Sequence, residues 1–527
     1  MNVQLIPTRT NNGQEKSFAD LVRMYEEHRK NLVALDFEFL INFGQALLRE
    51  GRIRKAIEIT REALSYTDDR VDRAFVYLSL CRMYRMMTLM KNARAELRRA
   101  FKELGVEYPR SGFPPFFWSI IGLFFTKAYS KTGGRAPKET LKMQLKVALY
   151  EEAGLSTYYL RGSNLLMLQI SFRAKKIAAE LGPSLEMINW LGATGTLLAI
   201  INQRAFSEIL LSRGDKIAKD LSLQYPQAKQ QMWRALSADY LRKPQMSVRI
   251  FEQIISDYKN IVTMSDLRLI CITMSCNYVI RGHTALASRA IEQLFTEYDK
   301  DCTEIFSCNK TFIEWYKIPS LSFGGETKKI EQILRNSRAI FASVDEEKWQ
   351  ITHYLGNVLI YYYLANQHDF EEVSNIFNRF NALRLSPERT FLEGGHYWVA
   401  KTYLLFELFY QDKANIPDIV KAISDLSRVQ KHPSIQSHYF VLKAHMALIQ
   451  GDYSSVRKNV EVAREIAAGI DNVWAECEAD KIIMMLSYKE RKITEAKEQF
   501  EGLQQKVKHL GWMGYQVQLE KYQNRYL

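Results

Sequence analysis

Residues 40–105 have the sequence LINFGQALLREGRIRKAIEITREALSYTDDRVDRAFVYLSLCRMYRMMTLMKNARAELRRAFKELG. The stretch contains two rounds of one pattern, in which large apolar residues on a first helix precede a turn and small residues on a returning helix. Gly44 and Cys81 are 37 residues apart, as are Ala56 and Ala93. Small residues let two helices pack closely, and a fixed period of about this length is typical of helical-repeat proteins. The stretch therefore predicts two consecutive helical hairpins.

The composition predicts an all-α protein with few flexible linkers. The chain has 527 residues, of which 47% are hydrophobic and 25% are charged, with only 12 prolines and 25 glycines. This is the balance of a soluble folded protein, and the length exceeds that of one compact core. We therefore expect two domains or one open-ended array, an α-α superhelix (solenoid) of degenerate helical hairpins.

The second half of the chain carries a repeat of its own. His353, His396 and His438 are each followed by tyrosine and recur at spacings of 43 and 42 residues. Such histidines could form a row on the inner face of an array, or each could pack against the neighbouring hairpin. Adjacent helices lie about 10 Å apart, which is too far for these side chains to share a metal ion. We expect neither a metal ion nor another cofactor.

The predicted domain organisation has four parts. Residues 1–16 form a polar tail, residues 17–317 an N-terminal array, residues 318–328 a possible loop or hinge, and residues 329–527 a C-terminal array. An amphipathic helix from Trp512 onward caps the second array, because open-ended solenoids need a capping element. The sequence leaves open whether residues 318–328 separate two arrays or form a longer loop in one continuous solenoid.

The cysteines and the apolar segments favour a cytoplasmic protein. None of the six cysteines forms a C-x-x-C pair, which is typical of reduced thiols. Residues 1–15 lack the apolar core of a signal peptide. The longest apolar run, residues 113–125, is too short to span a bilayer. The sequence as a whole predicts a protein of bacterial type.

The hairpins of residues 40–105 resemble those of the tetratricopeptide repeat family. Residues 36–180, which include a Leu-Gly pair at 104 and a Pro-Arg-Ser segment at 109, are similar to the repeat arms of large bacterial signalling ATPases and multidomain sensor kinases. Those proteins carry a nucleotide-binding domain upstream of the arm, whereas this chain starts almost at the arm. The resemblance implies a free-standing arm that retains a docking or sensing role.

The resemblance also places three polar side chains in a groove. In tetratricopeptide arrays the first helix of each hairpin lines the concave face, so Arg82 and Arg85 would face the groove, with Gln45 at the matching place in the preceding hairpin. Arginine binds carboxylate or phosphate with two parallel hydrogen bonds, which predicts a dock for an acidic segment. The alternative is a solvated basic face. The lysine and asparagine pattern of the carboxylate-clamp subfamily is absent, so a chaperone C-terminus is not favoured.

The net charge leaves several partner classes open. The chain carries a formal charge of +13, with a pI of about 9.2. This charge would suit nucleic acid, an anionic membrane or an acidic protein. No helix-turn-helix or other nucleic-acid-binding motif is found, and the basic residues are spread through the predicted helices. Nucleic acid is therefore an unlikely partner.

The sequence contains no recognisable catalytic motif. We find no G-x-x-x-x-G-K-[ST] phosphate loop, no H-E-x-x-H, no kinase signature and no G-x-S-x-G. The sequence therefore predicts a non-enzymatic scaffold or adaptor that binds a protein or peptide partner in a signalling or regulatory complex. The alternative is a ligand-sensing regulator that binds a small molecule or short peptide inside the superhelix.

Overall fold

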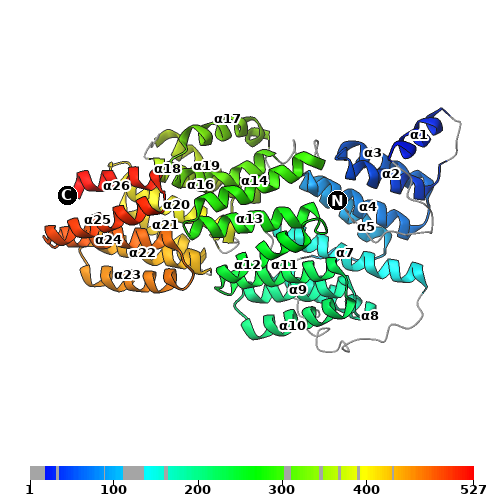
Figure 1. The fold of residues 1–527 in the computed structure, drawn as a ribbon, viewed down its shortest axis with the longest axis horizontal. Helices are drawn as coiled ribbons and strands as arrows, with labels where there is room; N and C mark the ends of the chain where they lie inside the picture. Colours follow the sequence, from blue (N-terminus) through cyan, green and yellow to red (C-terminus); the bar gives the residue numbers. More distant parts are fainter. Residues whose placement is uncertain are drawn as a thin grey trace. The chain divides into compact units, whose positions relative to one another are not determined.

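The protein is helical throughout the part that the structure describes. Figure 1 shows the computed structural model. The described residues are 18–30, 35–87, 89–110, 136–159, 164–301, 310–343, 348–365, 370–387, 392–429 and 432–526. These ranges contain α-helices and two short 3-10 helices but no strand, which confirms the predicted all-α helical-repeat fold. The predicted polar tail, residues 1–16, and the apolar run 113–125 lie outside the described residues. Among the described helices, none has the length and apolar character needed to cross a lipid bilayer.

The chain divides into two compact units. Unit 1 consists of Met1–Leu241, Arg249–Ile270 and Leu294–Lys310. Unit 2 consists of Arg242–Val248, Cys271–Gln293 and Thr311–Leu527. Three helices contribute residues to both units, namely α12 (Pro244–Tyr258), α13 (Met264–Ile280) and α14 (Thr284–Asp301).

The helices in the first half of the chain follow one another as antiparallel hairpins. They are α1 (Phe18–Arg29), α2 (Phe37–Arg49), α3 (Ile53–Glu62), η1 (Ala63–Tyr66), α4 (Arg70–Met86), α5 (Met90–Glu103), α7 (Pro137–Tyr159), α8 (Asn164–Leu181), α9 (Leu185–Ile200), α10 (Arg204–Leu221), α11 (Gln224–Tyr240), α12 (Pro244–Tyr258), α13 (Met264–Ile280) and α14 (Thr284–Asp301).

The two predicted hairpins are formed by α2 with α3 and by α4 with α5. The Asp36 side chain caps α2 by accepting a hydrogen bond from the Phe39 amide at 2.7 Å. Gly51 makes the turn with a φ of 73°, a left-handed conformation that glycine adopts without strain. Ala56 and Ala93 are both fully buried, so the small residues lie at the helix contacts as their spacing predicts.

The helices of the second half continue the hairpin pattern. They are η2 (Trp315–Lys317), α16 (Ile318–Phe323), α17 (Thr327–Ser343), α18 (Lys348–Ala365), α19 (Phe370–Ala382), α20 (Leu392–Phe409), α21 (Ile416–Val429), α22 (Pro433–Gln450), α23 (Tyr453–Ala468), α24 (Val473–Lys489), α25 (Ile493–His509) and α26 (Met513–Tyr526).

Residues 318–323 form a helix where the sequence predicts a loop. Pro319 lies in the first turn of α16, where a missing amide hydrogen costs no helical hydrogen bond. Ile318, Ser320 and Phe323 are buried, so this helix belongs to the core of unit 2. Only a short turn, Gly324, Gly325 and Glu326, separates α16 from α17.

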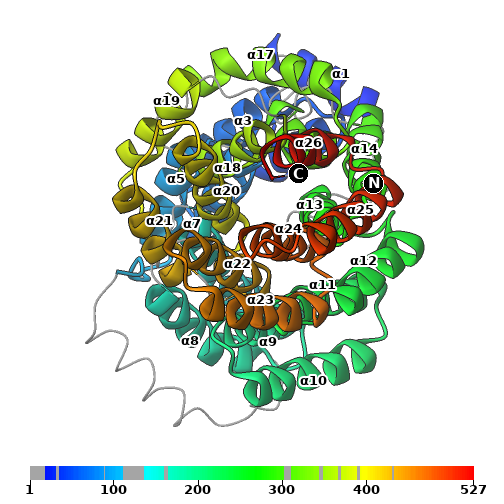
Figure 2. The ribbon, with the colours of Figure 1, turned by 90° about the vertical axis from the view of Figure 1, so that its left-hand side faces the viewer.

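The last helix, α26, packs inside unit 2. It contacts α25, which precedes it, and also α16 and α18, which lie more than 140 residues earlier. Figure 2 shows α26 within the curve formed by α18, α20, α22 and α24. We call the surface of α16, α18, α20 and α24 that contacts α26 the inner face of unit 2.

Candidate functional site

Arg82 and Arg85 in unit 1 both bind the carboxylate of Glu152. Arg82 Nε lies 2.9 Å from Glu152 Oε1, and Arg85 Nε lies 2.9 Å from Oε2. Arg85 also donates a 3.2 Å hydrogen bond to Ser265 Oγ. Glu152 is only 2% exposed, and the arginines are 16% and 14% exposed. The predicted arginine pair therefore holds a carboxylate of the chain itself, and a partner's acidic segment at this place would compete with Glu152. Gln45 is half-buried on α2.

Further charged residues lie beside this group in unit 1. Lys229 Nζ on α11 is 2.5 Å from Asp266 Oδ1 on α13, and the Tyr225 hydroxyl donates to Asp266 Oδ2 at 3.2 Å. Burial by itself raises the pKa of Asp266, but the Lys229 charge outweighs it and holds that pKa below its ordinary value. Burial raises the pKa of Glu151, the neighbour of Glu152. These helices carry a largely paired layer of buried charge.

The Glu152 carboxylate makes the stability of unit 1 depend on pH. Burial raises its pKa, but Arg85 and Arg82 outweigh burial and lower it overall. A carboxylate with a lowered folded pKa stabilises the fold above its unfolded pKa, about 4.3, and loses that contribution as the pH falls through the folded value. We therefore expect the difference in unfolding free energy between wild type and Glu152→Gln to be full at pH 7 and to shrink below pH about 4. Urea unfolding at pH 7, 5, 4 and 3 measures it, and a difference that does not change with pH would contradict the assignment.

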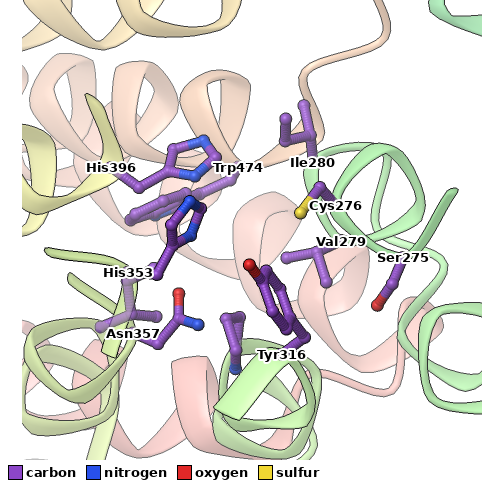
Figure 3. A pocket seen from close by; sticks show the side chains of 11 residues that line it. Ser275, Cys276, Val279, Ile280, Tyr316, His353, Asn357, His396 and Trp474 are labelled. Atoms are coloured by element: carbon purple, nitrogen blue, oxygen red, sulfur yellow. The ribbon is translucent and has the colours of Figure 1, made fainter. Parts of the chain in front are cut away.

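The structure brings two of the three predicted histidines to one cavity in unit 2. His353 on α18 and His396 on α20 line a cavity of about 30 Å³ together with Asn357, Cys276 and Trp474 (Figure 3). A volume of this size holds one or two water molecules and not a small organic ligand. Burial lowers the pKa of His396 to about 4, so its imidazole is neutral at pH 7.

The third histidine, His438, packs against Trp474, which is one of the residues that line the cavity. His438 Nδ1 is 2.9 Å from the Tyr403 hydroxyl, and the His438 ring centroid is 4.4 Å from that of Trp474. Burial holds the pKa of His438 well below its ordinary value. The described residues contain no group of three or more His, Cys, Asp or Glu side chains arranged to hold a metal ion. His396 and His438 are therefore neutral at pH 7, and His353 on α18 is buried near them.

The inner face of unit 2 carries a buried ion pair that sequence reasoning missed. Lys481 Nζ on α24 is 2.6 Å from Glu478 Oε2, and these side chains are 2% and 0% exposed. Lys481 donates a hydrogen bond of 2.7 Å to the Tyr363 hydroxyl, which donates one of 2.6 Å to Glu478 Oε1. The Lys481 ammonium also lies 4.6 Å from the ring centroid of Tyr522 and 5.8 Å from that of Tyr515, both on α26. Three tyrosine rings therefore enclose one buried cation.

The rest of α26 makes specific polar contacts with the same face. The Tyr522 hydroxyl donates to the buried Glu407 carboxylate on α20. The Arg525 guanidinium lies 4.6 Å from the ring centroid of Tyr410, the residue that follows α20. Gln518 is fully buried, and neither atom of its amide group hydrogen-bonds within the described chain. The helical spacing of these α26 residues was visible in the sequence, but nothing there indicated a buried lysine as their target.

No protein-family model matches the chain, and no curated protein matches it.

Proposed function

We propose that the protein is a non-enzymatic scaffold of tetratricopeptide-like hairpins that binds a protein or peptide partner through the inner face of unit 2. The observation that carries this proposal is α26, an amphipathic helix held on that face by side chains of α18, α20 and α24. Laying a helix into a groove is one of the common modes of peptide recognition. The setting that we propose is a cytoplasmic signalling or regulatory complex.

The charge of the chain supports a partner with acidic character. A net charge of +13 accelerates association with a partner of opposite sign, and this effect weakens as salt screens the charges. Arg82 and Arg85 do not contribute to this argument, because both guanidinium groups bind the chain's own Glu152. Charge contributes mainly to the rate of binding, whereas buried contacts on the inner face contribute specificity.

Affinity capture tests the scaffold function. The tagged full-length protein is incubated with lysate of its native cell at low and at high salt, and the retained proteins are identified by mass spectrometry. We expect one dominant protein that survives high salt, because buried contacts are screened less than exposed charges. A column carrying the thermally unfolded chain is the control. Retention of only nucleic acid or of a broad acidic mixture, lost at high salt, would contradict the proposal.

A further inference from the structure

We propose that α26 is a replaceable occupant of the inner face of unit 2, and that the partner binds by inserting a helix with the same contact pattern. This inference rests on the proposed function, because it describes the partner of that same surface. The pattern is a small residue and a tyrosine, then glutamine and leucine three and four positions after that tyrosine, then a second tyrosine seven positions after it. In α26 these residues are Gly514, Tyr515, Gln518, Leu519 and Tyr522.

The contact face of α26 carries more polar groups than that of the helix before it. Its buried side chains are those of three tyrosines, one glutamine and one aliphatic residue, Leu519. The preceding helix, α25, instead buries Ala496, Phe500, Leu503 and Val507. A polar group that is buried loses its hydrogen bonds to water, so the docking of α26 carries a desolvation cost that the apolar contact face of α25 does not carry.

The groups beneath α26 lower the cost of its release further. Lys481, Glu478 and Gln518 are all buried, and each regains water when α26 leaves. Hydration of a buried ion pair offsets much of its lost attraction, and hydration of Gln518 supplies hydrogen bonds that the described chain does not give its amide group. The docked and released states are therefore closer in free energy than they would be for an apolar helix.

The rings of Tyr363, Tyr515 and Tyr522 form a cage around the Lys481 ammonium, and this cage determines which helix can take the place of α26. Tyr363 belongs to the inner face, with its ring centroid 5.3 Å from the ammonium, whereas α26 supplies Tyr515 and Tyr522. Seven residues are about two helical turns, so both tyrosines lie on one side of the helix. A partner helix must therefore present two aromatic rings at this spacing, with one hydroxyl placed to reach Glu407.

The start of α26 sets a steric requirement. A β-carbon added to Gly514 would lie 2.0 Å from the carbonyl oxygen of Ser322, which is a backbone atom of α16. Trp512, immediately before the helix, is fully buried, and its indole donates to the Gly282 carbonyl at 3.3 Å. Trp512 therefore stays anchored, the hinge for release lies at Met513, and the replaceable segment is α26, Met513–Tyr526.

A peptide-binding experiment with the full-length protein tests this inference. The probe is a fluorescein-labelled peptide of residues 513–527, followed by anisotropy. Gly514→Ala keeps α26 helical but prevents its docking, so the vacant inner face binds the probe at least about tenfold more tightly than wild type does. Gly502→Ala on α25 is the matched control, because a β-carbon there meets nothing within 4 Å. It should bind the probe as weakly as wild type.

A second protein variant and a second probe make the outcome decisive. Tyr522→Ala weakens the internal α26 without altering the inner face, so it should also bind the probe more tightly than wild type, and it replaces Gly514→Ala if circular dichroism shows that variant to be unfolded. A probe with both Tyr515 and Tyr522 changed to alanine should not bind. Equal probe affinity for wild type and both variants, or equal binding of the two probes, would overturn the inference.

The two proposals can fail independently. Probe binding that depends on Gly514, with no partner captured from lysate, would contradict the scaffold function and leave the replaceable helix intact. A partner captured at high salt whose binding is unaffected by Gly514→Ala and by excess probe would support the scaffold function and contradict replacement of α26.

Discussion

Replacing Glu152 by alanine is expected to lower the free energy of unfolding by about 3–5 kcal/mol. The change leaves Arg82 and Arg85 beside each other, 16% and 14% exposed, without the carboxylate that both of them bind. Two like charges in a poorly solvated place repel each other, and neither can be deprotonated at neutral pH. The cost arises from the charges left behind as well as from the lost ion pairs.

Urea unfolding at pH 7 followed by circular dichroism and by tryptophan fluorescence measures this effect, and the two probes test whether unfolding is two-state. The matched control is Glu498→Ala, which removes an exposed glutamate from the middle of α25 and should change stability by less than about 0.5 kcal/mol. A loss below about 1 kcal/mol for Glu152→Ala would show that the arginine pair does not depend on this carboxylate.

Replacing Lys481 by methionine is expected to cost about 3–5 kcal/mol as well. Methionine fills a similar volume but leaves the carboxylate of Glu478 buried and without its cation. The lost ammonium also ends the interaction with the rings of Tyr363, Tyr515 and Tyr522. We expect part of the response to be faster opening of α26, because two of those rings belong to it.

A double variant separates the ion pair from the packing. Lys481→Met combined with Glu478→Gln removes both charges and should recover most of the stability lost in the single variant, since replacing a buried ion pair completely is often nearly neutral. Lys497→Met on the exposed side of α25 is the control for the side-chain change and should be nearly silent. If the double variant is as unstable as the single one, the cage is held by packing and not by charge.

The helical fold and its first hairpins could be predicted from the sequence because their cause is local. Ala56 and Ala93 repeat at the position where two helices touch, and Gly51 has the conformation that its turn requires. The loop predicted at residues 318–328 is wrong for 318–323, because a proline in the first turn of a helix starts it and does not break it. Local sequence alone did not distinguish these two roles of proline.

The candidate sites depended on contacts between distant residues and were only partly predictable. The pattern placed Arg82 and Arg85 side by side, but Glu152 lies 70 residues from Arg82, and no spacing rule connects them. The sequence likewise predicted an amphipathic terminal helix. It could not show that α26 packs against α18, or that Tyr522 of α26 reaches Glu407, which lies 115 residues earlier in the chain. Contacts at such separations follow from the path of the whole array.

Amide hydrogen exchange of the full-length protein, read by mass spectrometry, tests the central claim most directly. It compares α26 with α23, α24 and α25 in the presence and absence of excess isotope-labelled 513–527 peptide, whose fragments differ in mass from those of the protein. Replacement predicts that the peptide accelerates exchange in the protein's own α26 and leaves α23 to α25 unchanged. If α26 exchanges as slowly as α25 and the peptide has no effect, α26 is a fixed part of the core and the inner face of unit 2 is not a binding site.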